Sequence, residues 1–163
     1  MDKVLRDKVS LLNPVHFLAL GFGSGLAPKA PGTFGSFVAI PLLLLLSNTQ
    51  TWWFVVLAIL VSVIGIWVCD KTACDMGVHD HGSIVWDEIA GMFCAFIFVP
   101  LSWDTLLIGF ILFRWLDIQK PWLIGRLDKA MKGGLGIMAD DILAGLVTAV
   151  LLHVYLVLSV MIF

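Results

Sequence analysis

The stretch SIVWDEIAGMFCAF, residues 83–96, places two adjacent acids at the start of an apolar run. The acids are Asp87 and Glu88, and Gly91 follows Asp87 by four residues. Residues four apart lie on one face of an α-helix, so Gly91 would sit one turn below the carboxylate. Charged groups in apolar segments are costly and usually mark function. The stretch therefore predicts a helix with a functional acid pair at its beginning.

The same arrangement occurs again in ADDILAG, residues 139–145. Here Asp140 and Asp141 open an apolar run, and Gly145 follows Asp141 by four residues. Small residues on facing surfaces allow two helices to approach closely. We therefore expect the two helices to pack against each other, with up to four carboxylates close together.

The composition is that of a membrane protein. Of the 163 residues, 60% are hydrophobic and 13% are charged, and the mean hydropathy is +1.01. Soluble domains have about 25% charged residues, so we expect one integral-membrane domain, residues 1–163, surrounded by membrane lipids. The formal net charge of −2 provides no basic surface for nucleic acid, which is not an expected partner. Nothing in the sequence predicts the oligomeric state.

The apolar runs predict an all-α, polytopic helical bundle with about five membrane helices. Several runs are shorter than the ~20 residues that a perpendicular span needs, so tilting or local thinning of the bilayer is expected. A glycine-rich apolar stretch at 15–27 has the length of a re-entrant or interfacial helix. The five predicted membrane helices cover residues 34–47, 52–69, 85–102, 105–118 and 136–163.

The distribution of charge predicts the orientation of the bundle. If the N-terminus is cytosolic and 15–27 does not cross, all 10 Lys and Arg residues fall at the cytosolic side, as the positive-inside rule requires. All acids except Asp104 fall on that side as well, near helix ends. The sequence therefore predicts a site that opens toward the cytosolic lipid headgroups.

The two acid pairs suggest a divalent cation site. Four carboxylates held close together repel one another unless a cation joins them. Carboxylates combined with water and substrate phosphate are the ligands that Mg2+ prefers. The alternative is that the acids are helix N-terminal charges stabilised by the helix dipole, but their recurrence in so apolar a chain favours the metal. The candidate ligands are Asp87, Glu88, Asp140 and Asp141.

Two basic regions are candidates for binding phosphate. In FRWLDIQKPW, the residues Arg114, Asp117 and Lys120 follow one another at spacings of three on a helix that Pro121 should end. Such cations can bind phosphate oxygens, or they can be snorkelling charges with an internal salt bridge.

The second region is the turn GLAPKAPGTFGS, which precedes a helix expected to start near Phe34. There Thr33 or Ser36 could cap the helix, and Lys29 with free backbone N–H groups could bind an anion. The alternative is an ordinary glycine- and proline-rich turn.

A polar stretch, CDKTACDMGVHDHGS, is predicted to be a loop on the same cytosolic side. Its histidines could act as acids, bases or ligands, although histidines in a loop are commonly only solvated. The residues that it adds to the site region are Asp70, Asp75, His79, Asp80 and His81.

Four segments of the chain, read in order, are GLAPKAPGTFGS, MGVHDHGSIVWDEIAGM, FRWLDIQKPWLIGRLD and GGLGIMADDILAG. Together they resemble the bacterial phosphatidylglycerophosphatase A family. The resemblance extends from about Asn13 to Gly145. It implies an inner-membrane enzyme that uses Mg2+ to hydrolyse phosphatidylglycerophosphate to phosphatidylglycerol and inorganic phosphate.

The resulting hypothesis is metal-assisted hydrolysis of a phosphate monoester. The acid pairs would hold one or two Mg2+ ions, which neutralise the phosphate and activate a water. Asp117 would orient the lysine and arginine side chains that bind the phosphate, and His81 or Asp80 would protonate the leaving group. A covalent aspartyl intermediate stays open as a second route. The phosphate-binding group would consist of Lys29, Thr33, Ser36, Arg114, Asp117 and Lys120.

Two alternatives belong to other functional classes. A transporter would place ionisable groups near the bilayer midplane and often show inverted repeats, which this sequence does not. A non-catalytic scaffold would need its charges only for orientation in the membrane, with the cytosolic face offering at most a metal or anion site.

Overall fold

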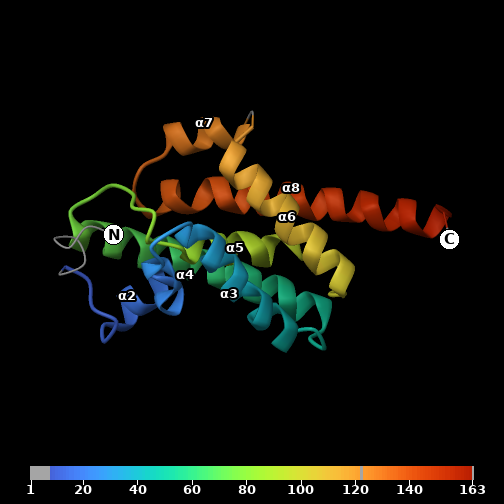
Figure 1. Cartoon of the computed structure of the whole chain (residues 1–163), viewed down its shortest axis with the longest axis horizontal. Coiled ribbons are helices and arrows are strands. Elements are labelled where there is room, and N and C mark those ends of the chain that lie inside the picture. The colour runs from blue at the N-terminus through green and yellow to red at the C-terminus, as the bar shows by residue number, and fades with distance from the viewer. Residues whose placement is uncertain (1–7, 122, 163) are drawn as a thin grey trace.

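The computed structural model describes residues 8–121 and 123–162, and every regular element in these residues is a helix (Figure 1). The predicted all-α class is confirmed there. The N-terminus, which the predicted orientation places in the cytosol, lies outside the described residues. In chain order the elements are α2 (Pro14–Ala19), the 3-10 helix η1 (Gly21–Leu26), α3 (Pro31–Leu45), α4 (Thr51–Met76), α5 (Trp86–Ala95), α6 (Trp103–Gln119), α7 (Leu123–Ala130) and α8 (Gly133–Ile162).

The short helix α5 forms the centre of the bundle. It packs against α3, α4, α6 and α8, and every residue from Ile89 to Ala95 is buried. The stretch 83–96 therefore contains the helix that packs against four others. The long helix α8 continues past the rest of the bundle at its C-terminal end, and α7 lies beside its N-terminal part (Figure 1).

Two helices in the described part of the chain are long and apolar enough to cross a membrane, judged by length and composition. They are α4, Thr51–Met76, and the stretch Gly133–Met161 of α8. The other predicted membrane segments form shorter helices, of 17 residues in α6, 15 in α3 and 10 in α5. Helix length and composition therefore support two of the about five predicted membrane helices. Residues 15–27 form α2 and η1, and neither is long enough to cross.

Two helices end at other residues than the sequence predicted. The predicted loop after residue 69 is helical as far as Met76, because Cys69, Thr72, Ala73 and Met76 keep a buried helical face. The run expected to be helical over 85–102 leaves the helix after Ala95.

The start of α3 contradicts the expected cap. The helix begins at Pro31, three residues before Phe34, and the preceding Ala30 adopts a left-handed conformation with no side-chain cap. Proline is favoured in the first helical turn, since it has no N–H to satisfy and its φ suits a helix. The prediction that Thr33 or Ser36 caps α3 is therefore wrong.

The two acid pairs occupy different positions along their helices. Asp87 and Glu88 lie in the first turn of α5, as expected. Because α8 begins at Gly133, Asp140 and Asp141 lie about two turns inside it, and the prediction that they open the helix is wrong. The helix dipole therefore does not account for the second pair, since its effect fades within the first turn.

Candidate active site

The backbones of α5 and α8 are nearly in contact. A Cβ atom added to Gly145 would overlap the carbonyl oxygen of Gly91 and lie 2.9 Å from the Cβ of Cys94. A Cβ atom added to Gly91 would lie 2.8 Å from the carbonyl oxygen of Asp141 and 2.5 Å from the ring of Phe113. Glycine is required at both positions, so the predicted close packing of the two helices is confirmed.

One turn from these glycines, the acid pairs come together. Carboxylate oxygens of Asp87, Glu88 and Asp141 lie within 4.8 Å of one another. A second group with the same mutual spacing contains Asp117, Asp140 and Asp141. Asp141 belongs to both groups and is 3% exposed. It is therefore the carboxylate at the centre of the cluster.

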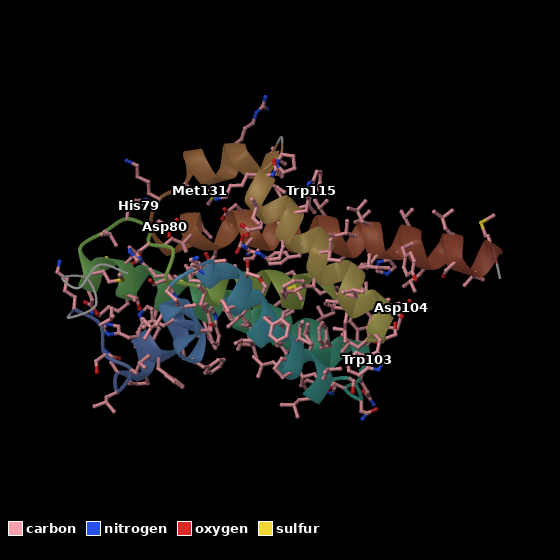
Figure 2. The ribbon with its side chains drawn as sticks, in the orientation of Figure 1. His79, Asp80, Trp103, Asp104, Trp115 and Met131 are labelled. Atoms are coloured by element: carbon pink, nitrogen blue, oxygen red, sulfur yellow. The ribbon has the colours of Figure 1, made fainter. Side chains whose placement is uncertain are left out.

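The cluster faces a cavity of about 220 Å³, which we call the acidic cavity. Figure 2 shows His79 and Asp80 on the loop after α4, beside the connection between α7 and α8 that contains Met131. The cavity is thus bounded by residues of three helices, α5, α6 and α8, and by one loop. Its lining residues in the described chain are His79, Asp80, Gly82, Ile84, Asp87, Glu88, Asp117, Lys120, Gly136, Ile137, Asp140 and Asp141.

Lys120 forms an ion pair across the cavity. Its Nζ lies 2.6 Å from Oδ2 of Asp140, which is nearly buried. Lys120 is also the C-cap of α6 and has a left-handed backbone, with φ of 43°. The helix ends there, as the following Pro121 predicted. A non-glycine residue in this conformation is strained, and such strain persists where surrounding contacts impose it.

Arg114 connects three helices beneath the acids. Its Nη1 donates to Asp117 Oδ2 at 2.5 Å and to Ser36 Oγ at 3.3 Å, and lies 3.9 Å from Glu88 Oε1. Ser36 is fully buried on α3 and donates to the carbonyl of Gly32. Arg114 thus holds a carboxylate from α5 and one from α6 near a hydroxyl from α3.

The polar atoms of this site are incompletely satisfied. Asp87 Oδ1, Glu88 Oε2 and Arg114 Nε are buried and have no hydrogen-bond partner among the described residues. Buried polar atoms are normally paired, so unpaired ones indicate a missing ligand or a catalytic role. Six carboxylates and one lysine line the cavity within the described chain. The donor set therefore suits a divalent cation with oxygen ligands.

Gly32 explains how Glu88 reaches the cluster. A Cβ atom on Gly32 would overlap Oε1 of Glu88, so the carboxylate lies directly against the backbone of α3. Nothing in the sequence identified this contact, because Gly32 also reads as part of a turn. The structure thus links the glycine-rich segment to the acid pair through packing.

Some predicted site residues lie elsewhere. Lys29 is exposed, Thr33 is half-buried, and neither lines the acidic cavity. His81 is also outside the lining, and its Nδ1 accepts a hydrogen bond from the backbone N–H of Ser83. His79, by contrast, does line the cavity.

The sequence placed Asp70 and Asp75 in a loop, but both lie on α4, and neither lines the acidic cavity. Asp75 interacts with His16 and Lys71, and Asp70 contacts the start of α8.

The sequence gave no sign that Lys120 pairs with Asp140, since the two are 20 positions apart on different helices.

A recessed cluster of acids beside Lys120 and Arg114, in a bundle with two helices that could cross a membrane, fits a membrane-associated enzyme that acts on phosphate groups. Comparison with known families places the chain within that class. The family model described as phosphatidylglycerophosphatase A matches residues 17–156. The chain belongs to this family of phosphatases, and the resemblance seen in its motifs is confirmed.

Curated relatives agree with this assignment. A phosphatidylglycerophosphatase A of Escherichia coli (strain K12) is 46% identical over 151 residues, which cover 92% of this chain and 88% of the relative. One of Haemophilus influenzae is 50% identical over 141 residues, covering 85% and 86%. A putative phosphatidylinositol-3-phosphatase of Bacteroides thetaiotaomicron is 37% identical over 145 residues, covering 84% and 90%. No solved structure matches the chain.

Proposed function

We propose that the protein hydrolyses phosphatidylglycerophosphate to phosphatidylglycerol and inorganic phosphate, in a Mg2+-dependent reaction of phospholipid biosynthesis. The observation that carries the proposal is the convergence of Asp87, Glu88, Asp140 and Asp141 beside Lys120. The substrate is taken from the names of the family and of two relatives. The geometry supplies the reason why a phosphate ester would bind there.

The charge of the acidic cavity supports a role for Mg2+. A phosphate monoester is anionic and would be repelled by the carboxylates. When bound, Mg2+ would neutralise the phosphate and lower the pKa of a water, which makes water a better nucleophile. The ligands would come from the two carboxylate groups that share Asp141, and Asp117 joins the candidates because it belongs to one of them.

The remaining polar groups suit the transfer of phosphate to water. The oxygen of water attacks phosphorus, the bond from phosphorus to the glycerol oxygen breaks, and a proton passes to that oxygen. Lys120 would hold a phosphate oxygen, and Arg114 would keep Asp117 and Glu88 in place. For protonation, His79 and Asp80 line the cavity whereas His81 does not, which favours the first two.

We also propose that the acidic cavity faces the cytosol in the bacterial inner membrane. This follows from the positive-inside rule applied to the five predicted membrane helices. Helices α3, α5 and α6 would then lie within the membrane beside α4 and α8, with the bilayer locally thinned because these helices are short.

Phosphate release from the purified protein tests the function. Phosphatidylglycerophosphate in detergent micelles should release inorganic phosphate with Mg2+, and EDTA should abolish the release until Mg2+ is restored. Release that continues in EDTA would remove the metal from the proposal. Phosphatidylinositol 3-phosphate should be assayed in parallel because of the Bacteroides relative. Faster hydrolysis of that lipid would contradict the proposed substrate.

A further inference from the structure

The start of α8 is held by a carboxylate from another helix. Oδ1 of Asp70, on α4, accepts a hydrogen bond of 2.8 Å from the backbone N–H of Gly134. The first N–H groups of a helix have no partner within it, and a negative charge beside them also interacts favourably with the helix dipole. Asp70 therefore caps α8 from outside.

The sequence at this contact is fitted to the carboxylate. Gly133 has φ of +68°, and a Cβ atom on it would lie 2.8 Å from Oδ1 of Asp70. A Cβ atom on Gly134 would overlap the carbonyl oxygen of Ile66. Two consecutive glycines thus let α8 begin directly against α4, at a point where a larger residue would displace it.

From this point α8 continues without interruption to the catalytic acids. Asp140 follows Gly134 by six residues, or about 9 Å of helix. Between them, the side chain of Met138 packs against Gly65, where a Cβ atom would be too close to it. The Sδ atom of Met138 lies 3.8 Å from the Sγ atom of Cys69. These apolar contacts have little directionality, whereas the hydrogen bond to Asp70 fixes where the helix begins.

We propose that Asp70 is a positioning residue for the proposed reaction, because it sets the axial position of α8 and hence that of Asp140 and Asp141. The inference rests on the proposed function. Asp70 does not line the acidic cavity in the described chain, so it would act through the helix rather than on substrate. Small displacements matter, since an error of about 1 Å at a reacting group can reduce a rate 100-fold.

The test compares Asp70→Ala, Asp70→Asn and Asp75→Ala. Asparagine keeps the oxygen that accepts from Gly134, whereas alanine removes it. With saturating Mg2+, Asp70→Ala should lower kcat about tenfold with KM within about twofold. Asp70→Asn should stay within about threefold of wild type. Asp75→Ala is the matched control, since this acid is on the same helix and pairs with His16 and Lys71; its kcat should be unchanged.

Hydrogen exchange supplies a readout that does not depend on activity. In Asp70→Ala, the amides of the first two turns of α8 should exchange faster, and Asp70→Asn should restore their protection. Wild-type exchange or wild-type kcat in Asp70→Ala would overturn the role of Asp70 while leaving the function intact. Equal losses in the alanine and asparagine variants would overturn it too. A wild-type protein that releases no phosphate would instead overturn the proposed function, and the role of Asp70 with it.

Discussion

Two cavities of similar size lie at opposite ends of α5. The acidic cavity measures about 220 Å³ and adjoins the first turn of the helix. The other, which we call the apolar cavity, measures about 280 Å³ and adjoins its C-cap, Phe96. The apolar cavity is lined by Leu46, Ser47, Thr49, Thr51, Phe54, Phe96, Phe98, Val99, Pro100 and Leu101. Volume therefore does not distinguish the two, whereas charge does.

The two cavities differ in the kind of ligand that their linings favour. The acidic cavity holds buried oxygens without partners, and these favour a cation and the anion that it attracts. The lining of the apolar cavity contains hydroxyls but no charged residue within the described chain. If the acidic cavity is the active site, substitutions near it should lower phosphate release much more than substitutions near the apolar cavity.

The largest effect is expected from Asp141→Asn, because Asp141 belongs to both carboxylate groups. Phosphate release should fall on the order of 100-fold or more, while the protein still inserts into membranes. The control is Asp104→Asn. Asp104 lies at the opposite end of α6 from the acidic cavity (Figure 2) and accepts a hydrogen bond from Tyr155. If both variants lost phosphate release to a similar extent, the acidic cavity would not differ in function from the opposite end of the bundle.

The next effect concerns the contact that brings the acids together. Gly145→Val would force α8 away from the carbonyl of Gly91, and overpacking of this kind costs about 1–3 kcal/mol. The thermal midpoint in detergent should fall, and phosphate release should fall with it. Gly82→Ala is the control for stability, since a Cβ atom there meets nothing within 4 Å. An unchanged midpoint in Gly145→Val would show that the helices can separate freely.

Lys120→Met should act more moderately. Without the ammonium group, KM for the phosphate ester should rise about tenfold, because a charge-assisted hydrogen bond contributes roughly 1.5–3 kcal/mol. Initial rates over a range of substrate concentrations would measure this. Lys71→Met is the matched control, since Lys71 pairs with Asp75 outside the acidic cavity. A drop in kcat with KM unchanged would assign Lys120 to the chemical step rather than to binding.

The smallest effect is expected at the apolar cavity. Thr49→Val removes a hydroxyl from its lining with little change in shape, and surface substitutions of this kind usually change stability by about 0.5 kcal/mol or less. Phosphate release should stay within about twofold of wild type. A tenfold loss would show that the apolar cavity also takes part in the reaction.

The sequence predicted the convergence of the two acid pairs well because its signals are local. The i, i+4 spacing of each acid and its glycine gave the helix face, and the glycines implied close backbones. Both inferences hold for Gly91 and Gly145 in the structure. The end of α6 before Pro121 was predicted for a similar reason, since proline acts on its immediate neighbour.

Features that depend on tertiary contacts were missed. The end of α4 looked like a loop because charges interrupt it, although Cys69, Thr72, Ala73 and Met76 keep helical spacing and could have shown otherwise. The early end of α5 had no such signal, because the chain stays apolar through Phe98, which takes a positive φ of 60°. Pairings such as Lys120 with Asp140 required the fold itself.

The contact between Gly91 and Gly145 has a consequence for the membrane as a whole. A charged site inside a bilayer risks becoming a leak for protons and metal ions. Here the two backbones touch one turn below the carboxylates, and the ring of Phe113 closes over the same point. If the acidic cavity opens to one side of the bilayer, as proposed, this contact would close the other side and preserve the ion gradients across the membrane.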